Sequence, residues 1–210
     1  MINTTLSPEV AGARLGNLTA SRMADATART KTGWGASRAN LMANLAVERL
    51  TGVPMEGYMN AAMAWGIEKE PEARTAYEWL FDVEVVPTGY LPHPTIAHSG
   101  ATPDGAVGND GLIELKCPQS ATHIETLLTK SVDGKYVKQM QWQLACSGRK
   151  WVDFSTYDPR FPEPLRLWTF RVARDDKMIA ELESEARTFL AELDEMVAAL
   201  RRLGRMDVAA

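Results

Sequence analysis

The segment TPDGAVGNDGLIELK brings two carboxylates and a lysine close together in the sequence. Asp104 stands before a glycine-rich turn, while Glu114 and Lys116 follow the turn and are separated only by Leu115. Because successive side chains of a strand point to opposite faces, Glu114 and Lys116 are expected to project from the same face. The GNDG sequence favours a hairpin, so Asp104 and Glu114 should occupy two neighbouring strands.

Two carboxylates held side by side repel each other, and a divalent cation between them removes that repulsion. With oxygen ligands only, and no His or Cys nearby in the motif, the expected ion is Mg²⁺, with Mn²⁺ as the alternative. Lys116 beside them could orient or deprotonate a water, or offset charge that builds on a phosphate. A solvated surface hairpin is the alternative interpretation. The surrounding LIELKCP sequence suits a buried strand, however, and unpaired charge is costly there.

The spacing of apolar residues predicts the helices that position this segment. A helix is expected over 36–51, and Gly52 and Pro54 terminate it. A second helix is expected over 59–80, where Pro71 should produce a kink or a break. The apolar residues expected to face inward on these two helices are Leu41, Leu45, Leu50, Met63, Ile67, Tyr77 and Leu80.

Short β-branched segments predict the strands of a sheet. The DVEVVPTGY segment should form a strand that ends at Pro87, and WVDFSTYDP and LRLWTFRV should form two more. A helix is expected from about 131 to 147, and a long amphipathic helix over 176–202 closes the chain. The inward positions of the closing helix are Met178, Leu182, Phe189, Leu193, Met196 and Leu200. The predicted fold class is therefore α/β (α+β), with a central mixed β-sheet flanked by helices and a long C-terminal helix.

The composition is that of an ordinary soluble globular chain. Residues 1–210 should form a single domain with a sizeable core, because the hydrophobic fraction is 45% and the charged fraction 24%. The sequence shows no signal peptide and no membrane-spanning run, so a cytoplasmic location without membrane contact is expected. Cys117 and Cys146 form no CxxC or Cys/His cluster, and both are expected to be buried small residues.

The net charge of −4 argues against a general nucleic-acid binder, but the charge is distributed unevenly. Residues 1–50 contain six basic and three acidic residues, a net charge of +3, which leaves −7 for the remainder. Binding depends on the local field more than on the total charge, so a local site for a polyanion is permitted.

Several ordered motifs resemble one nuclease family. They are GNLTASR, AWGIEKEPEARTAYE, GATPDG, IELKCP and YVKQMQWQLACSGRKWVDFSTYDPRF, followed by the final helix. Together they cover most of the chain and are similar to the phage lambda exonuclease and YqaJ-like viral recombinase family of the PD-(D/E)XK nucleases. The resemblance implies a restriction-endonuclease-like core in a single exonuclease domain. It also implies that Asp104, Glu114 and the Leu115 carbonyl are metal ligands and that Lys116 is the catalytic lysine.

Two further residues match the family near the implied metal site. Glu70 matches an upstream helical glutamate that assists the metal and the water, and its G-x3-E-x2-A spacing favours it over its neighbours. Gln139 matches the first glutamine of a Q-x-Q motif close to the site. The alternatives to these two, expected on helix surfaces or a half-exposed helix, are Glu68, Glu72, Gln141 and Gln143.

The resemblance implies DNA contacts in other segments. Arg29 and Lys31 compete for the role of the basic residue that contacts a 5′-phosphate, because the loop that carries them is shorter than the family's. A solvated loop residue is the alternative for both. Ser21, in the TAS motif, could donate its hydroxyl to the same phosphate. Met63 stands where the family has an apolar wedge that separates the strands, and a plain core residue is the alternative.

The expected function is that of a Mg²⁺-dependent 5′-to-3′ exodeoxyribonuclease acting on the ends of duplex DNA. It would leave a 3′ single strand for recombination by annealing. The polarity, this role, a homotrimer that encircles DNA, a single-strand annealing partner and a phage or prophage origin in a bacterial cell follow from the resemblance alone. One alternative is a structure-specific or restriction-type endonuclease of the same fold. Another is a noncatalytic DNA-binding recombination module, against which the intact Asp104, Glu114 and Lys116 argue.

Overall fold

The computed structural model describes residues 7–55 and 60–206. The helices are α1 (Pro8–Arg14), the 3-10 helix η1 (Ala20–Arg22), α2 (Met23–Ala26), α3 (Ala36–Thr51), α4 (Ala61–Phe81), α5 (Ser120–Thr129), α6 (Gly134–Ser147), α7 (Glu163–Arg166) and α8 (Asp176–Met206). The strands are β1 (Leu18–Thr19), β2 (Arg29–Thr30), β3 (Gly33–Trp34), β4 (Val85–Val86), β5 (Leu91–Pro92), β6 (Ser99–Ala101), β7 (Gly105–Val107), β8 (Gly111–Lys116), β9 (Trp151–Tyr157) and β10 (Leu167–Ala173). None of the helices in these ranges is long and apolar enough to cross a membrane.

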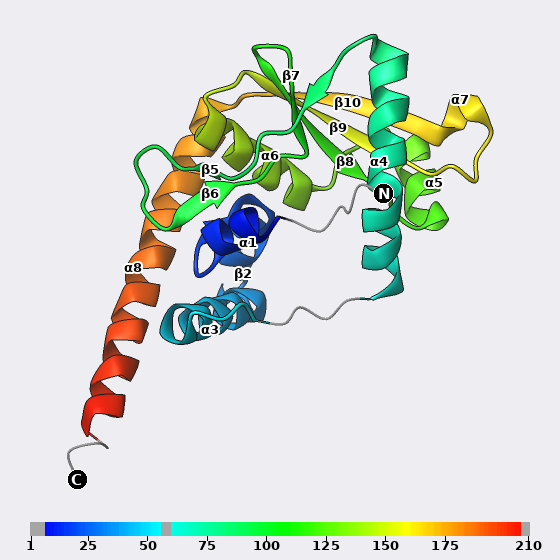
Figure 1. Cartoon of the computed structure of the whole chain (residues 1–210). Helices are drawn as coiled ribbons and strands as arrows, with labels where there is room; N and C mark the ends of the chain where they lie inside the picture. The colour runs from blue at the N-terminus through cyan, green and yellow to red at the C-terminus, as the bar shows by residue number, and fades with distance from the viewer. Residues whose placement is uncertain (1–6, 56–59, 207–210) are drawn as a thin grey trace.

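The largest sheet is mixed and has the strand order β10-β9-β8-β7-β4 (Figure 1). β8 and β9 run parallel, with Ile113 opposite Asp153, whereas the other neighbouring strands are antiparallel. Helices lie against this sheet and a long helix ends the described chain, so the predicted fold class is confirmed.

Different helices cover the two faces of this sheet. Tyr77 of α4 belongs to the same buried cluster as Ile113 and Leu115 of β8. Met140 of α6 belongs to a second buried cluster, which contains Leu112 of β8. Because neighbouring residues of a strand face opposite ways, α4 lies on one side of β8 and α6 on the other. The central strand is therefore buried on both faces.

A three-stranded sheet, in the order β1-β6-β5, ties the N-terminal segment to the rest of the molecule. β1 runs parallel to β6, with Thr19 opposite Gly100. Only glycine fits at position 100, because an added Cβ would lie 2.6 Å from the Leu91 carbonyl oxygen. β6 ends at Ala101, shortly before Asp104, so this pairing holds the N-terminal segment beside the predicted metal carboxylate.

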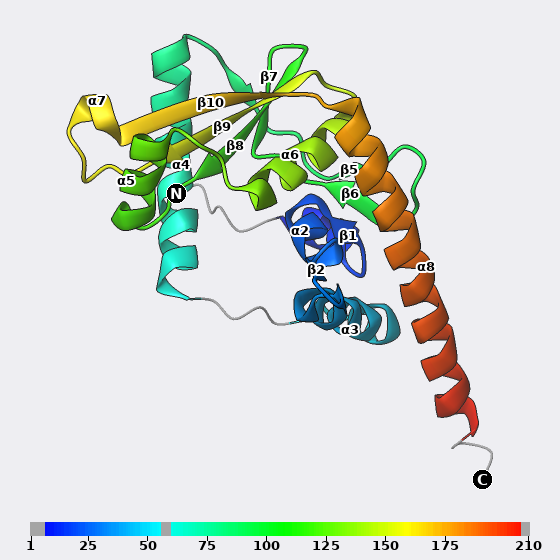
Figure 2. The ribbon, with the colours of Figure 1, turned by 180° about the vertical axis from the view of Figure 1, so that it is seen from behind.

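The third core cluster joins the N-terminal segment to α3, α6 and α8. It includes Leu41 of α3 and Phe189 of α8, and Arg38 of α3 donates a hydrogen bond to Glu192 of α8 at 2.7 Å. Both views show α8 passing beside α3 and continuing beyond it (Figures 1 and 2).

Most predicted elements are present with changed bounds. The helix over 36–51 is α3, and the closing helix is α8, which extends to Met206. The helix expected from 131 begins at Gly134, because the Asp133 side chain accepts from the Lys135 N–H and caps it. The LRLWTFRV segment begins in α7, and only β4 forms within DVEVVPTGY. The expected helix start at 59 lies outside the described residues. The helices α1 and α5 have no counterpart among the predicted elements; both are short, with 7 and 10 residues.

The break expected at Pro71 does not occur, because α4 is continuous from Ala61 to Phe81. Ala73 and Tyr77, which follow the proline, are fully or almost fully buried against the sheet. Packing of this part of α4 therefore holds the helix beyond a residue that normally ends or bends one.

Several apolar residues expected to face the core are exposed instead. Leu41, Leu45 and Tyr77 are buried as predicted. The exposed ones are Leu50, Met63, Ile67, Leu80, Met196 and Leu200. Apolar spacing identifies a helix face, but it does not tell which turns of that face meet a partner. On α4, the turns before Pro71 and the last turn carry apolar residues that extend past the sheet.

Candidate active site

Three residues of the predicted site come together around β8. Glu114 and Lys116 project from the face of β8 that α6 covers, and the Lys116 ammonium forms an ion pair with the Glu114 carboxylate. Asp104 directly precedes β7, and its Oδ2 accepts a hydrogen bond from the Leu115 N–H at 2.6 Å. The hairpin thus places the two carboxylates and the lysine as the alternation of the strand predicts.

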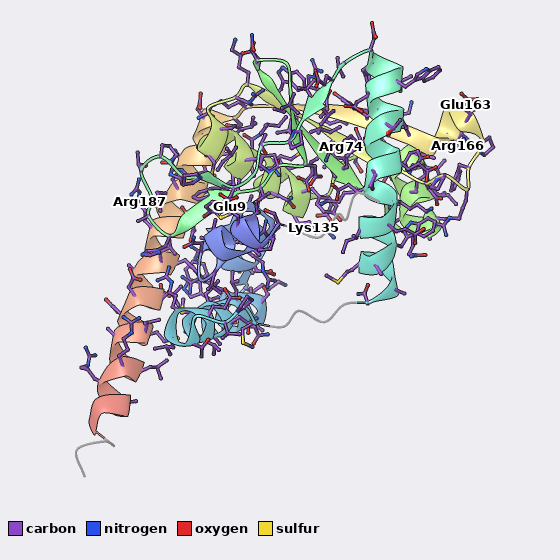
Figure 3. The ribbon with its side chains drawn as sticks, in the orientation of Figure 1. Glu9, Arg74, Lys135, Glu163, Arg166 and Arg187 are labelled. Atoms are coloured by element: carbon purple, nitrogen blue, oxygen red, sulfur yellow. The ribbon has the colours of Figure 1, made fainter. Side chains whose placement is uncertain are left out.

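Arg74 of α4 fixes the segment that carries Asp104. Its Nη2 donates to the Asp104 carbonyl oxygen at 2.6 Å and lies 3.5 Å from Glu70 Oε1. Figure 3 shows Arg74 extending from α4 toward the sheet. Gly105, which follows Asp104, cannot carry a side chain, because a Cβ there would lie 2.2 Å from Val85 Cγ1 and 3.1 Å from Arg74 Nη1. Arg74 therefore joins the helix of Glu70 to the loop of Asp104.

Glu70 is the glutamate of α4 that reaches the site. It lines the same cavity as Asp104, whereas Glu68 is exposed on the helix surface. Glu72 accepts a hydrogen bond from the Tyr157 hydroxyl at 2.7 Å. The choice of Glu70 by motif spacing agrees with this placement.

Two glutamines of α6 hold Glu114. Gln139 Nε2 donates to Glu114 Oε1 at 2.6 Å, and Gln143 Nε2 donates to Glu114 Oε2 at 2.6 Å. Gln141 instead donates to the Ala173 carbonyl at 2.8 Å, away from Glu114. The expectation that Gln143 is a residue of a half-exposed helix is wrong, because its side chain is fully buried beside the site.

The site opens into a cavity of about 340 Å³. Its lining includes Asp104, Glu114, Lys116, Glu70, Gln139, Arg14, Thr19 and Ser21. A second cavity, of about 720 Å³, shares Glu70 and Lys116 with the first and is lined on its other side by Met63 and Tyr136. Glu70 and Lys116 therefore stand where the two cavities meet.

Burial and mutual repulsion shape the electrostatics of this site. Burial, together with the charge of Glu114, raises the pKa of Asp104 well above its ordinary value. Burial also raises the pKa of Glu70, and the charge of Arg74 opposes this only in part. Burial alone would lower the pKa of Lys116, but the charges of Glu114 and Asp104 outweigh it and raise that pKa. The repulsion between Asp104 and Glu114 favours a cation bound between them.

The oxygen donors fit a hard divalent cation. Asp104 and Glu114 supply carboxylates, and Leu115, whose N–H donates to Asp104, follows Glu114 in β8 and lines the second cavity. Within the described ranges, no three or more Asp, Glu, His or Cys side chains gather closely enough to hold a metal by themselves. The Leu115 carbonyl, water or a phosphate oxygen could supply further ligands beside the two carboxylates.

Arg14 is a residue of the site that the sequence motifs did not single out. It lies in the last turn of α1, is half-buried, and forms no ion pair with any carboxylate among the described residues. Burial lowers its pKa. Ser21 and Thr19 line the same cavity, and their hydroxyl oxygens lie 3.4 Å apart. The lining of this cavity thus combines an arginine with two hydroxyl groups, residue types that bind anions. The position of Arg14, just before the GNLTASR motif, is the signal that could have found it.

Arg29 and Lys31 are not among the residues that line this cavity. Arg29 Nη2 lies 2.6 Å from Glu185 Oε1, and its guanidinium stacks over the Trp34 ring at 3.9 Å. Lys31 is exposed in the turn between β2 and β3. The structure thus brings Ser21, but neither of the two competing basic residues, to the carboxylates.

Met63 and the cysteines complete the predicted set. Met63 is 50% exposed beside the second cavity, so the alternative of a plain core residue is wrong. Cys117 is buried, as predicted, and Cys146 is partly buried. Burial raises the pKa of each thiol to about 12, so neither is a reactive thiolate.

The comparison with protein families identifies the chain. The family model described as "YqaJ-like viral recombinase domain" matches residues 11–150. This range contains the proposed metal ligands, Lys116, Glu70, Gln139, Gln143 and Arg14. The chain belongs to the YqaJ-like viral recombinase family. No curated protein matches the sequence.

Solved structures of nucleases are similar to this chain over nearly its whole length. The alkaline exonuclease LHK-Exo from Laribacter hongkongensis is 48% identical, with a TM-score of 0.88, and the match covers 95% of this chain and 99% of that one. The same enzyme in complex with dAMP gives a TM-score of 0.89 at the same identity and coverage. A phage-related exonuclease from Haemophilus somnus 129PT, 14% identical with a TM-score of 0.72 over 88% of this chain and 96% of that one, shares the fold. The family and the likeness to LHK-Exo show that this member of the YqaJ-like family is a nuclease.

Proposed function

We propose that this chain is a Mg²⁺-dependent exodeoxyribonuclease that degrades one strand of linear duplex DNA from its 5′ end. The observation that carries the proposal is a single cavity whose lining includes the two carboxylates, Lys116 and Arg14, which forms no ion pair among the described residues. Such a cavity can hold a scissile phosphodiester at the carboxylates while a terminal phosphate reaches Arg14. The exonuclease likeness supports action from an end.

Each residue has a role in this proposal. A divalent cation held by Asp104, Glu114 and the Leu115 carbonyl would act as a Lewis acid toward the phosphodiester, with Mg²⁺ favoured and Mn²⁺ as a substitute. Lys116 orients the attacking water or offsets the negative charge that develops on the phosphate oxygens. Glu70 assists the metal and the attacking water. Gln139 orients the Glu114 carboxylate through its 2.6 Å hydrogen bond.

Arg14, Thr19 and Ser21 would bind the terminal phosphate. A charge-assisted pair between a guanidinium and a phosphate is worth about 1.5–3 kcal/mol when neither group is fully solvated. On this proposal, hydrolysis at the carboxylates would release one nucleotide and leave a new terminal phosphate on the shortened strand. Repetition of this step leaves the complementary strand as a 3′ tail. We propose that this tail serves recombination by annealing, in the cytoplasm and with a single-strand annealing protein as partner.

We further propose that residues 1–210 form one nuclease domain and that three copies form a closed ring around the DNA. A single 23.2 kDa chain with net charge −4 offers little surface for retaining DNA through many cuts. A ring would retain it by topology, with the basic N-terminal segments facing the channel.

The decisive experiment uses linear duplex DNA labelled separately at the 5′ and 3′ end of one strand. Early release of the 5′ label in Mg²⁺, and none in EDTA, is expected. Release of the 3′ label first would refute the polarity. Cutting of covalently closed circular DNA would instead support an endonuclease of the same fold.

The phosphate site is tested with matched variants. Wild type should degrade a 5′-phosphorylated end about 10- to 100-fold faster than a 5′-hydroxyl end. Arg14→Ala should remove this preference, and Arg29→Ala should keep it. The reverse pattern would return the phosphate contact to the loop of Arg29 and Lys31.

A further inference from the structure

Three glutamines recur at every second position of α6, and the helix geometry separates them into two groups. A residue turns by about 100° from its predecessor, so Gln139 and Gln143 point in directions only about 40° apart, while Gln141 points to the opposite side. The contacts follow this division. Gln139 and Gln143 reach the active site, whereas Gln141 ties α6 to the segment that joins β10 to α8.

Gln139 and Gln143 each donate to a different oxygen of Glu114. Both N–H to O distances are 2.6 Å between the heavy atoms, Nε2 of Gln139 to Oε1 and Nε2 of Gln143 to Oε2. A carboxylate only accepts hydrogen bonds, so each amide must present its nitrogen to Glu114. Donors on both oxygens fix the plane of the carboxylate as well as its position.

The buried amide of Gln143 is explained by its hydrogen bond to Glu114. The side chain is fully buried, and its carbonyl oxygen has no hydrogen-bond partner among the described residues. A buried, unpaired carbonyl is costly, and an apolar side chain of the same size would avoid that cost. The benefit that remains is the hydrogen bond to Glu114, which is itself only 1% exposed.

We propose that Gln143 is a positioning residue of the active site, which with Gln139 clamps the Glu114 carboxylate in the plane required to ligate the divalent cation. The proposal rests on the metal-dependent nuclease proposed above and assigns a role to a residue that touches neither the substrate nor the metal. Partners that orient ligating groups in this way are typically worth 10- to 100-fold in metal affinity.

The test compares Gln143→Leu and Gln143→Met with Gln141→Leu. Both position-143 variants remove the donor and nearly keep the volume, and the two shapes guard against failure of one of them to fold. Three quantities are measured: Mg²⁺ and Mn²⁺ binding to the DNA-free protein by calorimetry, the Mg²⁺ concentration for half-maximal cleavage, and the melting temperature without metal.

The position-143 variants should bind metal about 10- to 100-fold more weakly and need correspondingly more Mg²⁺. They should also melt below the wild-type temperature, because the buried Glu114 Oε2 loses its donor. Gln141→Leu should melt at a lower temperature and keep wild-type metal affinity, because it loses only hydrogen bonds to the main chain. Wild-type metal affinity in Gln143→Leu or Gln143→Met would overturn the clamp, as would a position-143 melting temperature lowered as much as that of Gln141→Leu without loss of affinity. If the wild type itself bound no divalent metal and cleaved in EDTA, the proposed function would fail first, and the two failures are therefore distinguishable.

Discussion

Replacement of Arg74 by methionine should damage the active site from a position outside the cavity. The side chain keeps a similar length but loses the 2.6 Å hydrogen bond to the Asp104 carbonyl and the 3.5 Å pairing with Glu70. A hydrogen bond from a charged group contributes about 1.5–3 kcal/mol, and the Asp104 carbonyl would be left without that donor. For a chain of this size that loss corresponds to a melting temperature lower by about 3–12 °C.

The loss should appear in catalysis as well as in folding. Arg74 joins the loop of Asp104 to the helix of Glu70, so without it both carboxylates lose their alignment, and the rate at saturating Mg²⁺ should fall about 10- to 100-fold at temperatures where the variant is fully folded. The matched control is Arg149→Met. Arg149 also donates to main-chain carbonyls of this hairpin, Gly108 at 2.8 Å and Gly111 at 2.7 Å, but at the turn and away from the cavity.

Circular dichroism melting and a single-turnover exonuclease assay on the same preparations separate the two effects. Arg149→Met should lose stability and keep its rate, whereas Arg74→Met should lose both. A wild-type rate in Arg74→Met would refute this account of Arg74, and so would an equal loss of rate in both variants.

Further predictions address the lysine, the wedge, an acid-sensitive contact and the assembly. Lys116→Ala should abolish cleavage and largely retain metal binding, while Asp104→Ala should lose both, as calorimetry beside a nuclease assay would show. Met63→Ala should slow degradation of blunt duplexes but not of ends that are already frayed, because an apolar wedge helps to unstack base pairs; equal slowing on both ends would contradict a wedge. Burial alone would raise the pKa of Asp158, but hydrogen bonds from Arg160 and Ser120 outweigh it and lower that pKa to about 2. An unfolded aspartate titrates near 3.9, so this contact stabilises the fold above about pH 4 and the stabilisation is lost toward pH 2. The difference in melting temperature between wild type and Asp158→Asn should therefore be largest at pH 7 and should decrease between about pH 4 and pH 2. Light scattering should report three copies per particle, and a trap-DNA assay should show many cuts per binding event; a monomer that dissociates after each cut would contradict the ring.

The parts of the site that the sequence predicts are those that depend on local geometry. The alternation of a single strand places Glu114 and Lys116 on one face, and the glycine-rich turn brings Asp104 beside them. The positions of Arg14 and Gln143 depend on contacts between elements that are distant in the sequence. Arg14 reaches the cavity only because β1 pairs with β6, and Gln143 reaches Glu114 only because α6 covers that face of β8. Neither pairing can be deduced from the spacing of the residues within its own element.

The two cavities also give the proposed reaction a direction. Glu70 and Lys116 line both cavities; Met63 also lines the larger one, and Arg14 and Ser21 also line the smaller one. The smaller cavity is bounded by the β1–β6 pairing, which holds the N-terminal segment against the loop of Asp104. We propose that a strand entering on the Met63 side places a short terminal piece, rather than a continuing duplex, beyond the carboxylates. On the proposed function, this arrangement explains how a nuclease core that has no inherent preference for ends can act from one.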